Sequence, residues 1–212
     1  MEEDVKQRII DRVGIIPEQV EGTELIIETA VSYSDEGTAK AAYLAACQRM
    51  IQVNQWSEII DGITAKFQLH TDAGEPVDGI AKKDLLIQVD LPAPGTLLGR
   101  GYDWVHIEEY AEGQTALTEF KAFRVRPTYN PTQKEEGIAH FYAPTATVTW
   151  VLYREHETVH CIIFDRNLQP NTEESGSHWV DLVRNSVLGT AAAGGMSKVQ
   201  WEKLVKAILQ DV

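Results

Sequence analysis

The spacing of apolar residues changes near residue 63, and this change limits the folds open to the chain. Before it, Ala39, Tyr43 and Met50 recur at helical spacing in a run of small residues, which predicts a helix packed closely on a sheet. Across residues 63–165, segments of alternating apolar and polar side chains follow one another, separated by turn-forming residues. Residues 23–32 are an earlier strand candidate. The chain is therefore expected to fold as an α+β domain with an antiparallel sheet of about seven strands.

Helical spacing also marks both ends of the chain. Val5, Ile9 and Val13 predict a short amphipathic helix that packs on the outside. Residues 177–193 carry apolar residues at helical spacing, and Ser197 followed by Gln200 forms the capping pattern that opens a last helix. These boundaries predict a single domain over residues 1–212, with an N-terminal helical extension (1–22), a core (23–193) and an extra C-terminal helix (194–212).

The order of one strand, helices, six strands and a C-terminal helix resembles the helix-grip arrangement of the START and Bet v 1-like superfamily, over residues 23–193. The resemblance implies a curved antiparallel sheet wrapped around a long C-terminal helix, with an apolar cavity between them. In that superfamily the cavity holds lipids, hormones or polyketides, and in some members it is a catalytic site. The helices at the two ends depart from the pattern. The segments PAPG, GYDWV and RNLQPN also resemble those of an uncharacterised bacterial protein family, and that likeness implies no activity.

The charge of the chain argues against several classes of partner. A formal charge of −13 and an isoelectric point near 4.8 disfavour nucleic acid and anionic membrane surfaces. No run approaches the roughly 18 apolar residues of a membrane span, so no membrane insertion is expected. Cys47 and Cys161 lie in apolar runs and are interpreted as buried small hydrophobic residues. The charged N-terminus lacks the apolar stretch of an export signal, and the expected location is the cytoplasm.

The sequence lacks the short motifs that mark many metal and cofactor sites. No C-x-x-C, H-E-x-x-H or clustered histidine spacing occurs, so no metal is predicted. The G-x-S-x-G nucleophile motif and the Walker phosphate loop are also missing, and no cofactor is predicted. The catalytic residues are unknown from the sequence, and whether the protein is an enzyme stays open at this stage.

Two pairs of candidate ligand-binding residues lie on neighbouring predicted strands. Trp104 and His106 share a strand face with Glu108, and this face either lines a site or faces solvent. Arg124 and Arg126 share a face of the next strand. They would either bind a carboxylate of the ligand or pair with glutamates across the sheet.

A further cluster combines His140 and Tyr142 with Asp165 and Arg166 on later strands. The alternation leaves open which of these side chains face the interior. Asp165 and Arg166 are either a buried pair near the mouth of a pocket or part of a turn-forming segment. Trp150 is also a candidate, because inward aromatic residues would line the cavity of a helix-grip fold.

Three functions fit these residues. The first is binding of a small hydrophobic or amphiphilic molecule in an internal cavity, as a carrier or sensor. The second is an enzyme of the cyclase or dehydratase kind that uses an acid or base in the cavity. The third is a protein-interaction domain whose last helix, residues 197–209, docks on another protein or on a second copy in a homodimer. The lining of the cavity should discriminate among them, since one fold serves many functions.

Overall fold

The computed structural model describes residues 3–60, 65–91, 96–171 and 198–210. The predicted closing helix at 177–193 therefore lies outside the described residues. Among the helices that the structure describes, none has the length and apolar character needed to cross a lipid bilayer. The elements, in chain order, are α1 (Glu3–Val13), β1 (Thr23–Ser32), α2 (Glu36–Ile51), the 3-10 turn η1 (Val53–Gln55), α3 (Trp56–Ile59), β2 (Lys66–His70), β3 (Leu86–Asp90), β4 (Asp103–Gln114), β5 (Thr118–Pro127), the 3-10 turn η2 (Lys134–Glu136), β6 (Thr147–Glu155), β7 (Thr158–Leu168) and α5 (Lys198–Leu209).

The described strands form one seven-stranded antiparallel sheet in the order β1-β7-β6-β5-β4-β3-β2. Neighbouring strands from β2 to β7 follow one another in the chain, and β1 crosses over to pair with β7. A bulge in β4 between Ile107 and Glu109 shifts its register against β5, and such bulges bend a strand. The predicted α+β class and antiparallel seven-stranded sheet are therefore confirmed.

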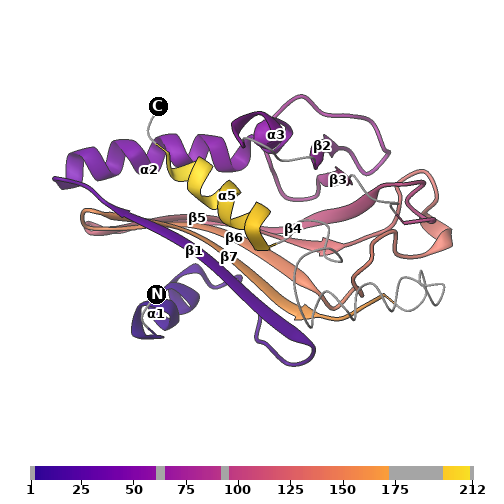
Figure 1. The fold of residues 1–212 in the computed structure, drawn as a ribbon, viewed down its shortest axis with the longest axis horizontal. Coiled ribbons are helices and arrows are strands. Elements are labelled where there is room, and N and C mark those ends of the chain that lie inside the picture. The colour runs from indigo at the N-terminus through magenta and orange to yellow at the C-terminus, as the bar shows by residue number, and fades with distance from the viewer. Residues whose placement is uncertain (1–2, 61–64, 92–95, 172–197, 211–212) are drawn as a thin grey trace.

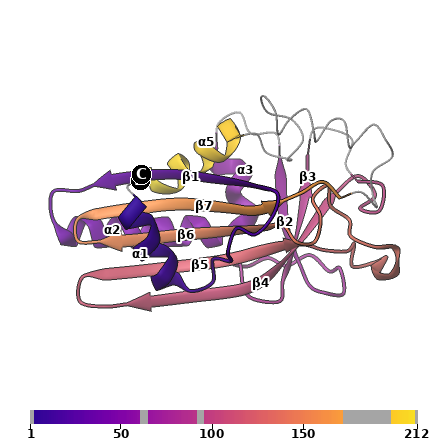
Figure 2. The ribbon, with the colours of Figure 1, turned by 90° about the horizontal axis from the view of Figure 1, so that it is seen from below.

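The helices divide between the two faces of the sheet (Figure 1). Helices α2, α3 and α5 lie over one face, here called the inner face, and α1 lies against the opposite, outer face, as Figure 2 also shows from below. The larger apolar core is on the inner face and includes Trp56, Trp150 and Ile163. A smaller cluster on the outer face joins Ile9 of α1 to Phe164 of β7. The N-terminal helix thus packs on the outside of the sheet, as its spacing predicts.

Helix α2 is held close to the inner face by its small residues. Asp35 caps its N-terminus, because the carboxylate accepts a hydrogen bond from the backbone N–H of Thr38 at 2.9 Å. Ala39 and Ala46 are fully buried, which allows the helix backbone to approach the sheet. The close packing that these residues predict is therefore observed.

Helix α5 belongs to the main core on the inner face. Leu204, Val205 and Ile208 are fully buried on the inner face. The carbonyl of Ile208 accepts a hydrogen bond from the side chain of Arg49 on α2 at 2.7 Å. The predicted boundary between a core ending at residue 193 and an added helix stays a prediction, while the apolar side chains of α5 pack in the same core as the sheet.

Cavity lined by aromatic residues and buried carboxyl groups

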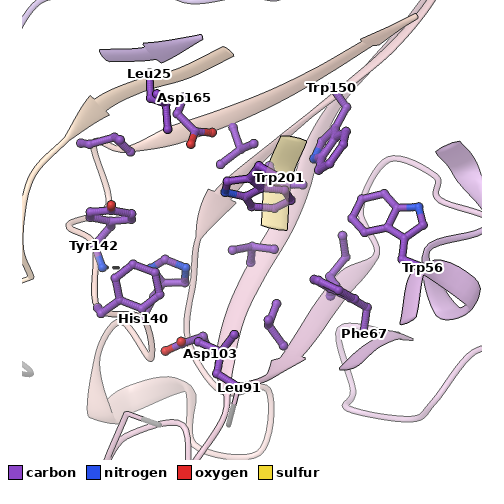
Figure 3. A pocket seen from close by; sticks show the side chains of 17 residues that line it. Leu25, Trp56, Phe67, Leu91, Asp103, His140, Tyr142, Trp150, Asp165 and Trp201 are labelled. Atoms are coloured by element: carbon purple, nitrogen blue, oxygen red, sulfur yellow. Dashed lines mark hydrogen bonds between the residues drawn. The ribbon is translucent and has the colours of Figure 1, made fainter. Parts of the chain in front are cut away.

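A cavity of about 110 Å³ lies between the inner face of the sheet and helices α3 and α5. Figure 3 shows its lining from close by, with side chains contributed by the sheet, the two helices and the segment that precedes β6. Its lining residues are mainly aromatic and aliphatic: Leu25, Trp56, Phe67, Ile87, Val89, Leu91, Asp103, Val105, Val125, His140, Phe141, Tyr142, Val148, Trp150, Asp165, Leu168 and Trp201.

Three tryptophans form a continuous aromatic wall. The ring centroids of Trp56 and Trp150 are 4.6 Å apart, and those of Trp150 and Trp201 are 5.1 Å apart. Phe67 contacts Trp56 edge to face, with centroids 5.2 Å apart. Because these rings come from α3, β2, β6 and α5, the wall forms only when the helices pack on the sheet.

The pairing of β6 with β7 explains why Asp165 faces this cavity. Val148 lies opposite Asp165, and Trp150 lies opposite Ile163. Side chains directly opposite each other on antiparallel strands point to the same face, so all four face inward. Asp165 therefore lines the cavity on the same inward face as the apolar side chains of Val148, Trp150 and Ile163.

Asp165 is a buried carboxyl group in apolar surroundings. Only 5% of the residue is exposed, and its Oδ1 atom has no hydrogen-bond partner within the part of the chain that the structure describes. Burial raises the pKa of Asp165 to about 7, because the charged form loses its hydration and gains no compensating cation. The group therefore exchanges between its acid and carboxylate forms near neutral pH.

His140 and Tyr142 line the same cavity as this carboxyl group (Figure 3). The Nδ1 atom of His140 accepts a hydrogen bond from the backbone N–H of Tyr142 at 3.0 Å, so the proton of the neutral ring is assigned to Nε2. Burial lowers the pKa of His140 to about 3, and the ring is neutral at physiological pH. Burial, and to a lesser extent the charge of Asp165, raises the pKa of the Tyr142 hydroxyl. Both side chains therefore present neutral polar groups.

Four of the sequence-predicted site residues line this cavity, namely His140, Tyr142, Trp150 and Asp165. Asp103 lines it as well and was missed as a candidate. A signal for it exists in the sequence, because Asp103 precedes Val105 by two residues and so shares its inward strand face. Trp56 and Trp201 were also missed, since their helical segments give no indication of what they contact.

Trp104 and His106 are not among the residues that line the cavity. They alternate with Val105, which does line it, so their side chains lie on the other face of β4. Trp104 packs with Leu86 in a small cluster, and His106 lies 3.7 Å from the exposed Asp84. The solvent-facing alternative therefore describes His106, and Trp104 is a core residue.

Arg124 and Arg126 also lie on the outer face, where they share the carboxylate of Glu108. Arg126 donates to both carboxylate oxygens, at 2.7 and 3.0 Å, and Arg124 donates to one of them. Burial by itself would raise the pKa of Glu108, but these hydrogen bonds outweigh burial and hold the pKa below its ordinary value. The structure thus shows the cross-strand ion pairs rather than a clamp for a ligand carboxylate.

Arg166 is separated from Asp165 by the thickness of the sheet. Consecutive residues of β7 point to opposite faces, so Arg166 lies outside and forms an ion pair with Glu24 at 2.9 Å. It also donates to the carbonyl of Pro17 in the segment that joins α1 to β1. The interpretation of Asp165 and Arg166 as a buried pair is therefore wrong.

The outer-face cluster gives a stability prediction. Replacing Glu108 by glutamine should lower the free energy of unfolding by about 1–3 kcal/mol, because two partly buried guanidinium groups lose their shared carboxylate. Chemical denaturation of both proteins measures the loss. Ligand affinity should stay unchanged, since the cluster lies on the opposite face of the sheet from the cavity. A variant of unaltered stability would contradict the assignment.

Within the described residues, no group of three or more histidine, cysteine, aspartate or glutamate side chains is arranged to hold a metal ion. The cavity offers two carboxyl groups, one neutral imidazole and one phenol in apolar surroundings. This set can bind a polar group of a small molecule, or donate and accept a proton, without a metal.

No family model and no curated protein matches the sequence. Among solved structures, a hypothetical protein from Helicobacter pylori is similar with a TM-score of 0.46 and 10% identity, over 89% of this chain and 87% of that one. Major latex-like protein 151 from Panax ginseng is similar with a TM-score of 0.32 and 10% identity, over 86% of this chain and 99% of that one. At these scores neither similarity bears on the ligand or the activity. The strand order and helix placement described above are consistent with a helix-grip fold.

Proposed function

We propose that the protein binds a small molecule with an apolar body and one polar group in this cavity, as a carrier or sensor. The observation that carries the proposal is a buried carboxyl group, Asp165, facing a cavity walled by aromatic rings. An unsatisfied buried polar atom costs about 1–3 kcal/mol, and a ligand that supplies its hydrogen bond recovers that cost. The aromatic wall would supply the remaining affinity by burying apolar surface.

The cavity volume limits the size of the enclosed part of the ligand. A cavity of about 150 Å³ holds one benzene molecule in an engineered protein, and the volume here is of similar order. We therefore expect the enclosed body to be about one ring or a short branched chain. The hydrogen-bonding groups of Tyr142, His140 and Asp165 would orient its polar end.

Binding can be measured through the tryptophans of the cavity wall. Titrating the protein with benzyl alcohol, a one-ring molecule with one polar group, should change tryptophan fluorescence in a saturable way and raise the melting temperature. Trp201→Ala should weaken binding about tenfold or more, because it removes one aromatic wall from the cavity. Trp104→Ala is the matched control, since it makes the same change at a tryptophan on the outer face. Equal affinity in the parent and Trp201→Ala would contradict the proposal.

The enzyme hypothesis is favoured by one specific observation, the buried carboxyl group of Asp165 inside the cavity, where burial raises its pKa to about 7. A carboxyl group with such a pKa can act as a general acid or base at pH 7, and the neutral phenol of Tyr142 lines the same cavity. Recovery of a bound probe in chemically unchanged form would favour the carrier function, and its conversion would favour the enzyme. Several apolar side chains of α5 are buried in the chain's own core, which does not favour docking of this face on a partner.

A further inference from the structure

We infer that the cavity selects a small organic cation, such as a protonated amine on an aromatic or aliphatic body, with Asp165 as the counter-ion of the cationic group. This inference rests on the proposed binding function and narrows it to one class of ligand. It depends on three features: the charges that line the cavity, the aromatic faces around it, and the position of Asp165.

The described lining of the cavity is acidic and carries no permanent positive charge. Asp103 and Asp165 both line it, while neither lysine nor arginine is among the described lining residues. Its histidine, His140, is held neutral by burial. A ligand carboxylate or phosphate would therefore meet the carboxyl group of Asp165 with no compensating cation among the described lining residues, which is unfavourable in apolar surroundings.

Three arginines of the sheet form ion pairs on its outer face and do not reach Asp165. Arg166 follows Asp165 in the chain but points to the outer face and pairs with Glu24. Arg124 and Arg126 also lie on the outer face and share Glu108. Asp165 is therefore left with a cavity on one side and no described cation, so a cationic ligand would supply the missing partner.

The aromatic wall suits a cation as well as an apolar body. Indole rings attract ammonium groups placed over their faces more strongly than the rings of tyrosine or phenylalanine do. Asp165, Trp201 and Tyr142 all line the cavity (Figure 3), and the charge of Asp165 acts on the hydroxyl of Tyr142. An ammonium group held at this end could contact both the carboxylate and an aromatic face, while its apolar body lies toward Trp150 and Trp56.

The ionisation of Asp165 adds a pH signature to this arrangement. The titratable groups that line the cavity with Asp165 are Asp103, His140 and Tyr142, and the last two are neutral between pH 5 and 8. Because the pKa of Asp165 is raised to about 7, a cationic ligand must displace its proton at lower pH. Affinity for an amine should therefore fall as the pH drops below 7, by up to about tenfold per pH unit.

Three one-ring probes that differ in charge test the inference: benzylamine, benzyl alcohol and benzoate, each titrated by calorimetry at pH 8 and pH 5.5. We expect benzylamine to bind about tenfold or more tightly than benzyl alcohol at pH 8, and benzoate to bind most weakly. Asp165→Asn should weaken the affinity for benzylamine about tenfold to a hundredfold. It should change the affinity for benzyl alcohol less than about threefold. Asp84→Asn makes the same chemical change at a side chain that is 79% exposed, and should leave all three affinities unaltered.

The outcomes separate this inference from the function on which it rests. If none of the three probes binds the parent protein, both the proposed function and the inference are overturned. If benzyl alcohol or benzoate binds as tightly as benzylamine, or if Asp165→Asn retains full affinity for the amine, the cation preference fails while ligand binding stands. The pH comparison needs only the parent protein, and an amine affinity that does not fall between pH 8 and pH 5.5 also overturns the inference.

Discussion

Replacing Trp150 by alanine is expected to lower the free energy of unfolding by about 3–5 kcal/mol, the usual cost of truncating a buried aromatic side chain. Trp150 is 2% exposed and contacts the rings of Trp56, Phe123 and Trp201. Its removal would leave α3 and α5 without the ring on which both pack. For a domain of this size the loss corresponds to roughly 6–20 °C in melting temperature.

Calorimetry and chemical denaturation measure the loss, and Trp104→Ala provides the comparison. Trp104 is 4% exposed, but it packs in a small cluster on the outer face. Both variants should therefore be destabilised, whereas only Trp150→Ala should alter the binding of one-ring probes. A Trp150→Ala protein with parental stability would show that the three tryptophans do not form the continuous wall described above.

The sheet was predictable from the sequence because its signal is local. Along a half-buried strand, residues that face the core alternate with residues that face outward. The inward face of β4 therefore follows from Val105 and Ile107 alone. The same rule would have placed Asp103 inside and Trp104 outside. It also forbids Asp165 and Arg166 from sharing a face, since they are neighbours on one strand. Those errors came from grouping residues by chemistry rather than by strand periodicity.

The cavity wall was not predictable, because it depends on how distant segments meet. Trp56 and Trp201 are 145 positions apart and come together only through the packing of α3 and α5 on the sheet. Helical spacing indicates that α5 has an apolar face but not which surface covers it. For this reason the sequence equally allowed α5 to dock on a partner, whereas in the structure it packs on its own inner face.

The roles of the arginines were undecided for a similar reason. An arginine on a strand face pairs with whichever carboxylate the neighbouring strand presents. The sequence does not reveal the bulge in β4 that shifts the register between Ile107 and Glu109. Once the register is known, Glu108 lies within hydrogen-bonding distance of both Arg124 and Arg126, and the anion-clamp hypothesis is no longer needed.

Asp165→Asn is expected to stabilise the ligand-free protein at pH 8 by about 2–4 kcal/mol, even though it should weaken the binding of amines. In the folded protein the pKa of Asp165 is raised to about 7 from an ordinary value of 3.8. Between these values the folded state binds one proton more than the unfolded state. Stability therefore falls as the pH rises from 3.8 to 7, and the full cost is present above pH 7. Asparagine has a similar shape and never carries that charge.

The pH dependence of the difference distinguishes this cause from a general effect of the substitution. Burial lowers the pKa of His140 from 6.5 to about 3, so its contribution to stability is present above pH 6.5 and is lost as the pH falls. Between pH 4 and 6.5 the contributions of His140 and Asp165 have opposite slopes and cancel in the parent protein. Asp165→Asn removes the contribution of Asp165, so the stability of the variant should rise relative to the parent by about 1.4 kcal/mol per unit of increasing pH over that interval.

Denaturation of both proteins at half-unit steps from pH 4 to pH 8 gives the difference directly. We expect the advantage of the variant to be close to zero at pH 4, to grow steadily, and to level off above pH 7. A variant that is less stable than the parent at pH 8 would mean that the Asp165 carboxylate is stabilised in the folded protein, contrary to the raised pKa. If the expected curve is found, the protein retains a destabilising carboxyl group in an apolar cavity. Such a cost is commonly tolerated where a residue is kept for function, and here a ligand cation would remove it.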